Sequence, residues 1–159
     1  MKKQTMKQML AVVVMFLAAT SVFAAQPQTG PVDSPLRGAF SVTLTPEEGG
    51  PPPFKMLILF TRDGGVVETD AGPPNPQQFS PGIGEWTREA DGQYTITYTQ
   101  LQFDEAQNLI GTFRAKITAT FDESKKIVIG HVRVRFYDMS EAITLEGEGL
   151  VEGTRLPLD

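Results

Sequence analysis

From residue 37 onward the sequence consists mainly of short runs in which apolar and polar residues alternate. In the first run, RGAFSVTLT, the apolar residues Phe40, Val42 and Leu44 are separated by Ser41 and Thr43. Alternation with a period of two places the apolar side chains on one face of a β-strand. We expect seven further strands, in FKMLILFTR, GVVETD, GEWTRE, GQYTITYTQLQF, LIGTFRAKITATF, KIVIGHVRVRFYD and AITLEGEGLVEGT.

Most of these strands are joined by short turns, such as DGG after the second run and ADG after the fourth. Glycine adopts positive φ without penalty, so such turns favour β-hairpins. Strands joined by hairpins form a meander, whereas a Greek key needs long crossings. An open meander has unpaired edges, which closure into a barrel removes. The sequence therefore predicts an all-β fold, an eight-stranded antiparallel up-and-down β-barrel without a major helix.

The N-terminus has the pattern of a secretory signal peptide. A basic segment, MKKQTMKQ, precedes the uncharged apolar run MLAVVVMFLAATSVFA, which ends in a small residue. We expect cleavage after Ala24, and a retained membrane anchor is the alternative. Residues 25–36 contain three prolines and predict a flexible tail before a barrel domain at 37–159. The protein is therefore expected to be secreted or periplasmic, without stable membrane insertion after cleavage.

Charge and composition exclude several classes of function. The signal carries three lysines, so its removal leaves 11 basic and 19 acidic residues and a net charge of about −8. Such a surface repels phosphate backbones, so no nucleic-acid partner is expected. The chain has one histidine and no cysteine, which excludes zinc sites and cysteine nucleophiles, and no metal or cofactor is expected. Without disulfides, the stability must come from the core.

The last two runs carry opposite charges on one face. One register pairs Arg133 with Glu146 and His131 with Glu148, and a shift by two pairs Arg135 with Glu146 and Arg133 with Glu148. Both registers oppose unlike charges across the strands. We interpret this face as the solvated outside of the barrel, and a polar lumen of an outer-membrane barrel is the alternative. No catalytic residue is expected, and His131 is expected to be an exposed member of this row.

The opposite face of the long strands combines small and apolar residues. An eight-stranded barrel has room for about one small ligand if its lining is not bulky. The residues expected to line such a cavity are Trp86, Tyr94, Tyr98, Phe113, Ile117, Val134 and Leu145. We therefore expect binding of a small apolar ligand in the interior. The alternatives are a structural or interaction domain with a filled core, and a cofactor-free cyclase or isomerase.

The stretch SPGIGEW places a proline and two glycines just before the single tryptophan. Glycines in a strand allow sharp bends and close packing. We expect this stretch to close one end of the barrel, with a cation lying over the indole of Trp86. The residues expected to take part in this closure are Ser80, Pro81, Gly82, Gly84 and Arg155.

The second run is apolar on both faces, because Leu57 and Leu59 alternate with Met56, Ile58 and Phe60. One of these faces lies outside a barrel, where leucines are expected to be covered. We expect the N-terminal tail or a second subunit of a homodimer to bury Leu57 and Leu59.

Four motifs together resemble a group of small secreted bacterial β-barrel proteins with a lipocalin-like, or calycin-like, architecture. They are GAF at 38–40, GPPPFKMLILFTRDG at 50–64, SPGIGEW at 80–86 and EGTR at 152–155. The resemblance extends over nearly the whole chain that follows the signal. It implies a lipocalin-like barrel and assigns no activity.

Overall fold

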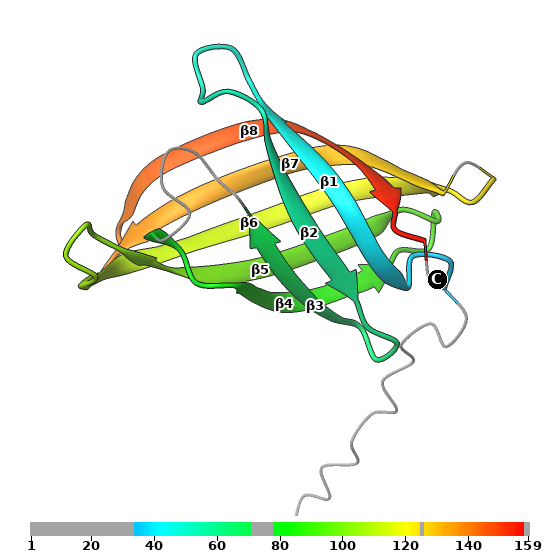
Figure 1. Ribbon diagram of the computed structural model, residues 1–159, viewed down its shortest axis with the longest axis horizontal. Coiled ribbons are helices and arrows are strands. Elements are labelled where there is room, and N and C mark those ends of the chain that lie inside the picture. Colours follow the sequence, from blue (N-terminus) through cyan, green and yellow to red (C-terminus); the bar gives the residue numbers. More distant parts are fainter. Residues whose placement is uncertain (1–33, 71–77, 125, 158–159) are drawn as a thin grey trace, which may run out of the picture.

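The computed structural model describes residues 34–70, 78–124 and 126–157, which form a closed barrel (Figure 1). Its strands are β1 (Gly38–Pro46), β2 (Phe54–Phe60), β3 (Gly65–Asp70), β4 (Gly82–Arg88), β5 (Tyr94–Phe103), β6 (Leu109–Asp122), β7 (Ile127–Asp138) and β8 (Ile143–Arg155). Each strand pairs antiparallel with the next one in the chain, and β8 pairs with β1. The prediction of an all-β, eight-stranded up-and-down barrel is confirmed. The described residues contain no helix long and apolar enough to cross a membrane.

The pairing of β7 with β8 follows the second of the two expected registers. Arg135 lies opposite Glu146 and Arg133 opposite Glu148, while His131 lies opposite Leu150. A register shift after Phe136 and a turn with Glu141 at a φ of 63° accommodate the longer loop that this register needs. The charged row faces outward and the inward row is apolar, so the interpretation as a polar lumen is wrong.

Aromatic rings fill the barrel at the end where Trp86 lies, which we call the Trp86 end. The indole is only 2% exposed, and its Nε1 donates a hydrogen bond to the carbonyl oxygen of Thr61 at 3.2 Å. Its ring centroid lies 6.3 Å from that of Phe60 and 5.9 Å from that of Tyr94. Phe60 in turn contacts Phe40 edge-on at 5.5 Å. Trp86 is therefore part of a continuous aromatic core.

The residues before β1 and the last residue of β8 seal this end. Leu36 is fully buried, and the Ser34 hydroxyl donates to the Tyr94 hydroxyl at 3.2 Å. Arg155 donates a hydrogen bond to the carbonyl of Pro35. Residues 34–36 of the expected tail therefore pack against the barrel. The rest of the expected tail and the signal peptide, residues 1–33, lie outside the described residues.

Arg155 covers different rings from the one expected. Its guanidinium carbon lies 5.3 Å from the ring centroid of Phe40 and 5.4 Å from that of Phe121. The reason is the seam of the barrel, where Arg155 is the direct partner of Phe40. The expectation that Arg155 lies over Trp86 is therefore wrong, although both residues belong to the same end.

The SPG part of SPGIGEW lies at the opposite end of β4 from Trp86. Ser80 fixes this segment to β5, because its N–H donates to the carbonyl of Leu101 and its hydroxyl accepts from the N–H of Leu101. At Gly84 a Cβ atom would lie 1.8 Å from the carbonyl oxygen of Thr97. Ser80, Pro81, Gly82 and Gly84 therefore bring β4 close to β5 and do not form the closure around Trp86.

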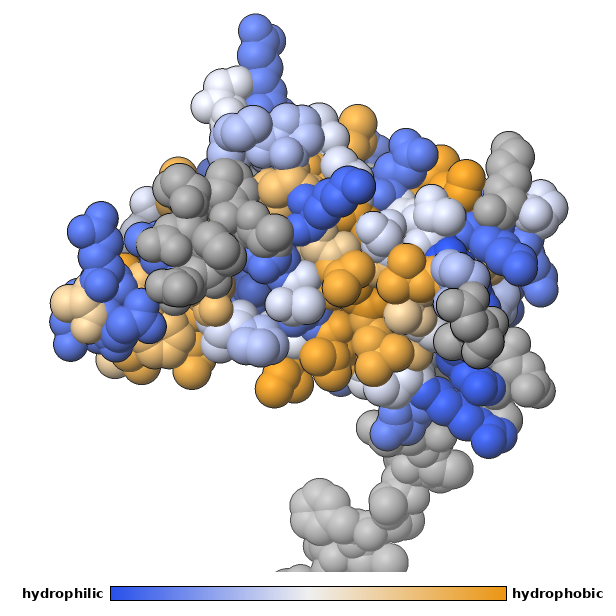
Figure 2. Space-filling model, viewed as in Figure 1, coloured by the Kyte–Doolittle hydropathy of each residue, from blue (hydrophilic) through white to orange (hydrophobic). Residues whose placement is uncertain are grey.

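Leu57 and Leu59 face outward and are 50% and 45% exposed. Val67 on β3 and Ile83 on β4 continue the apolar surface, which is visible over β2 and β3 in Figure 2. The N-terminal tail is one of the two expected covers for these leucines, and its residues 25–33 lie outside the described residues. Burial by a second subunit stays a prediction.

The position of Trp86 predicts a large loss of stability when its side chain is removed. Trp86→Ala should lower the free energy of unfolding by about 3–5 kcal/mol, because it leaves a cavity between Phe60 and Tyr94. Urea unfolding followed by circular dichroism measures this change, and Trp86→Phe serves as a milder control. An indole emission spectrum typical of full exposure would contradict the buried position.

His131 should contribute little to stability. Its side chain is exposed, and its neighbours across the strands are Thr118 and Leu150. His131→Ala should change the free energy of unfolding by less than about 1 kcal/mol, as is usual for exposed polar positions. A loss of several kcal/mol in the same urea experiment would show that the outward assignment of this face is wrong.

Candidate functional site

A carboxyl group lies inside the barrel, on β3. Val66 and Glu68 are two residues apart and both point inward, and the Glu68 side chain is fully buried. The position follows from strand geometry, because every second residue of a barrel strand faces the core. An inward glutamate is unusual, since buried carboxyl groups need partners or a changed protonation state.

Gly82 provides the space that Glu68 occupies. The two residues are direct partners in the pairing of β3 with β4. A Cβ atom at Gly82 would lie 2.8 Å from Oε2 of Glu68 and 2.7 Å from a ring carbon of Tyr98. A side chain at this position would push against both groups. The first glycine of SPGIGEW therefore allows the carboxyl and the phenol to share the interior.

The carboxyl oxygens of Glu68 are buried, and neither has a hydrogen-bond partner among the described residues. The neighbouring polar groups are engaged with other atoms. The Tyr98 hydroxyl lies 3.8 Å from the sulfur of Met56, and the Gln100 amide donates to the carbonyl of Ser80 at 3.1 Å. The same amide nitrogen lies 3.5 Å from Oδ2 of Asp70. Glu68 is thus the member of this polar cluster whose oxygens make no hydrogen bond of ordinary geometry, although the Gly82 backbone is near enough to oppose part of the rise in its pKa.

Burial determines the protonation state of Glu68. Loss of hydration, and secondly the charge of Asp70, raise the pKa of Glu68 to about 8. The pKa of Tyr98 also lies well above its usual value, mainly because of burial and then because of the charges of Glu68 and Asp70. At neutral pH both groups keep their protons. The cluster therefore presents a neutral carboxylic acid and a phenol, each of which is a hydrogen-bond donor.

Aromatic rings surround this cluster at the end of the barrel opposite Trp86, which we call the Phe113 end. The ring of Phe113 contacts those of Phe136 at 5.0 Å, Phe79 at 5.9 Å and Tyr98 at 6.2 Å between centroids. Phe79 and Phe136 are only partly buried, in contrast to Phe40, Phe60, Trp86 and Tyr94. Partly exposed aromatic rings next to a few polar groups are typical of the walls of small-molecule sites.

The structure divides the residues that the sequence predicted as a ligand site. Trp86 and Tyr94 belong to the Trp86 end, whereas Tyr98 and Phe113 are in contact at the Phe113 end. Ile117 is buried on β6, and Val134 packs beside the core on β7. These residues therefore do not form one continuous lining.

Leu145 does not line the interior, although the sequence predicted it. It lies opposite Phe136 near the start of β8 and is 59% exposed. Strands β7 and β8 are 12 and 13 residues long, whereas β3 has only six. The long hairpin extends past the shorter strands, so its tip lacks an opposite wall. The expectation for Leu145 is wrong for this reason.

Glu68 is not among the residues expected from the sequence to line the interior, although the sequence contains a pattern that indicates it. In GVVETD, Val66 and Glu68 occupy alternate positions of one short strand. If Val66 faces the core, Glu68 must face it too. A glutamate in phase with core residues is thus the pattern that predicts a buried carboxyl.

The protonation of Glu68 predicts a dependence of stability on pH. Between pH of about 4.5 and about 8 the unfolded chain releases a proton that the folded protein retains. Stability should therefore fall with rising pH across this window, on the order of 1 kcal/mol per pH unit, and then level off. Glu68→Gln should remove this component, so the difference in unfolding free energy between variant and wild type should grow with pH. Parallel profiles in urea unfolding would contradict a protonated Glu68.

No protein-family model and no curated protein matches this chain. Among the described residues, no group of three or more His, Asp or Glu side chains could hold a metal ion. The chemistry of the interior must therefore be deduced from the geometry of Glu68 and its neighbours.

Proposed function

We propose that the protein is a secreted or periplasmic β-barrel that binds a small, mainly apolar ligand at the Phe113 end of its interior. The observation that carries this proposal is the buried carboxyl of Glu68, which has no hydrogen-bond partner among the described residues. Leaving such a group unpaired costs about 1–3 kcal/mol. A ligand oxygen that accepts a hydrogen bond from the protonated acid would offset this cost.

The protonated Glu68 and Tyr98 and the neighbouring charge of Asp70 together favour an uncharged ligand. Glu68 and Tyr98 offer donors at neutral pH, so the ligand should present an acceptor such as a ketone, ester or hydroxyl oxygen. Asp70 lies beside them and would repel a carboxylate. The rings of Phe79, Phe113 and Phe136 would pack against the apolar part of the ligand.

Gly147, in the inward row of β8, supports access to this end. A Cβ atom added at Gly147 would meet Val134 at 3.4 Å, an ordinary contact, and no other described atom lies within 4 Å. Secretion is supported by the basic and apolar pattern of residues 1–24. The architecture that the sequence motifs resemble is that of lipocalin-like barrels, which is consistent with an interior ligand.

A second candidate function is favoured by the same carboxyl. A neutral acid with a pKa of about 8 can donate a proton to a carbonyl or epoxide oxygen near neutral pH. A cofactor-free cyclase or isomerase could use Glu68 in this way, with Tyr98 orienting the substrate. Turnover of a bound ligand, absent in Glu68→Gln, distinguishes this function from binding alone.

Binding can be measured with prodan, an uncharged naphthalene dye that carries a ketone. We expect a saturable blue shift of its emission at pH about 6, weakened about tenfold in Glu68→Met, which cannot donate a hydrogen bond. Glu68→Gln should retain binding, because its amide still donates. In the wild type, binding should weaken as the pH rises past about 8 and Glu68 ionises.

Two further variants make the measurement specific to the interior. Gly147→Leu should reduce binding by filling the Phe113 end, and Gly147→Ala is its milder counterpart. Glu85→Gln is the matched control, because Glu85 is exposed on the outer face of β4. If the dye does not bind saturably, or if Glu68→Met and Gly147→Leu bind like the wild type, the interior site is wrong and the protein is better described by a filled core.

A further inference from the structure

Four cations stand together on the outer face of β6 and β7. Arg114 lies directly opposite Arg135, and Lys116 lies directly opposite Arg133. Like charges that face each other across two strands destabilise the pair. The cluster occurs in a chain with 19 acidic and 14 basic residues, where opposite partners are plentiful. This arrangement therefore costs stability, which three neighbouring carboxylates offset only in part.

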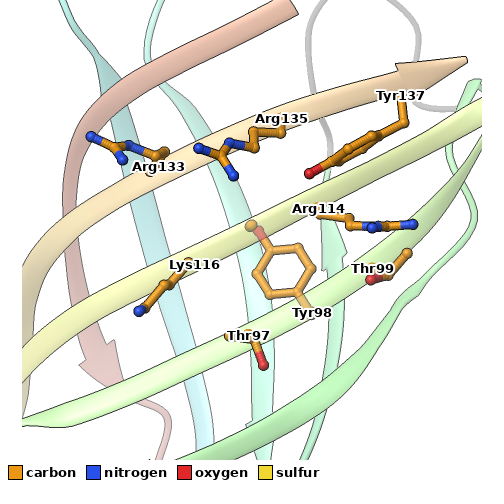
Figure 3. Close-up of a pocket in the computed structure, with 9 residues that line it drawn as sticks. Thr97, Tyr98, Thr99, Arg114, Lys116, Arg133, Arg135 and Tyr137 are labelled. Carbon is orange, nitrogen blue, oxygen red and sulfur yellow. The ribbon is translucent and has the colours of Figure 1, made fainter. Parts of the chain in front are cut away.

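A hollow of about 400 Å³ lies in the outer surface at this cluster (Figure 3). Thr97 and Thr99 on β5 form one side, and Tyr137 on β7 borders the other. The guanidinium carbon of Arg114 lies 4.3 Å from the ring centroid of Tyr137, so a flat stacked pair forms part of the wall. The volume is within the range of small-molecule sites, about 300–1,000 Å³.

Carboxylates at the rim hold three of the cations without neutralising the cluster. Arg114 pairs with Glu141, Arg133 Nε donates to Glu148 at 2.7 Å, and Arg135 Nε lies 3.5 Å from Glu146. These pairs are half-exposed and therefore weak. A guanidinium has five N–H donors, so each arginine retains donors for a further acceptor. Lys116 has no ion pair among the described residues.

We propose that this hollow binds a phosphate or sulfate ester of a small soluble molecule. Lys116 and Arg133 supply the charge opposite the anion, and the hydroxyls of Thr97 and Thr99 supply neutral donors beside it. A tetrahedral oxyanion accepts several hydrogen bonds at once, which suits a hollow lined by donors from three strands. The stacked pair of Arg114 and Tyr137 offers a surface for the organic part of the ester.

The rim favours a small ligand over a polyanion or a membrane surface. Glu141, Glu146 and Glu148 border the cations and would repel phosphates that extend past the hollow. The whole chain also carries a net charge of −5, which opposes adsorption to anionic surfaces. The anion must therefore fit within the hollow itself.

The test uses inorganic phosphate and phenyl phosphate, with chloride at equal ionic strength as the reference. We expect a saturable rise in melting temperature and saturable shifts of the backbone amide resonances around Thr97 and Lys116. Phenyl phosphate should bind more tightly than phosphate, because its ring can pack on Tyr137. Lys116→Gln should weaken binding about tenfold, through loss of a charge-assisted hydrogen bond.

A matched control separates this site from general charge effects. Lys55 is an exposed lysine on the outer face of β2, far from the hollow, so Lys55→Gln should leave phosphate binding unchanged. In chloride, Lys116→Gln should be at least as stable as the wild type, because it removes a like-charge pair.

Three results would overturn the proposal. They are the absence of saturable binding, equal weakening by Lys55→Gln and Lys116→Gln, and binding to anionic lipid vesicles without binding to the soluble esters. If Lys116→Gln were less stable than the wild type in chloride, the proposal would also be contradicted, because the lysine would then have a structural role. The outcome is independent of the interior, and Glu68→Gln should bind phosphate like the wild type.

Discussion

The pairing of β1 with β8 is the interaction on which the rest of this structure depends. It joins the first and last strands from Phe40 opposite Arg155 to Pro46 opposite Gly149. This pairing turns an open meander into a closed barrel, so that backbone donors and acceptors of both edges are satisfied. Arg155 reinforces the seam, because its side chain covers Phe40 and Phe121 and bonds to the carbonyl of Pro35.

Closure gives every strand one inner and one outer face. An ionisable side chain keeps its hydration on the outer face and loses it on the inner face. Outside, carboxylates and guanidinium groups remain hydrated, and even the like-charge pairs of Arg114 with Arg135 and Lys116 with Arg133 can be tolerated. Inside, loss of hydration raises the pKa of Glu68 and keeps its carboxyl protonated. The same barrel wall thus separates a cationic hollow on the outside from an uncharged carboxylic acid on the inside.

The two ends of the barrel differ in how completely side chains fill them. At the Trp86 end, rings of Tyr94, Trp86, Phe60 and Phe40 follow one another, and Leu36 and Arg155 cover them. At the Phe113 end, the rings of Phe79 and Phe136 remain partly exposed, and β7 and β8 extend beyond the shorter strands. Stability is therefore concentrated at one end, and the other is the end at which a ligand could be received.

Alternation and turn chemistry were sufficient to predict the strands and the up-and-down order, because both are local properties of the chain. They also reduced the pairing of β7 with β8 to two registers, since the short MSE turn leaves these two and both oppose arginine to glutamate. The choice between the registers depended on the bulge after Phe136 and the turn at Glu141, which no local pattern specifies.

Contacts between distant strands were decided only by the tertiary structure. The sequence alone determined that Glu68 shares a strand face with Val66, because side chains alternate along a strand. Only the closed barrel determined that Gly82 and Tyr98 enclose this carboxyl and that Arg155 meets Phe40 and not Trp86. It also placed Leu145 beyond the wall of the barrel. The physical reason is that such contacts depend on strand register, stagger and relative length, which are set jointly by all eight strands when the barrel closes.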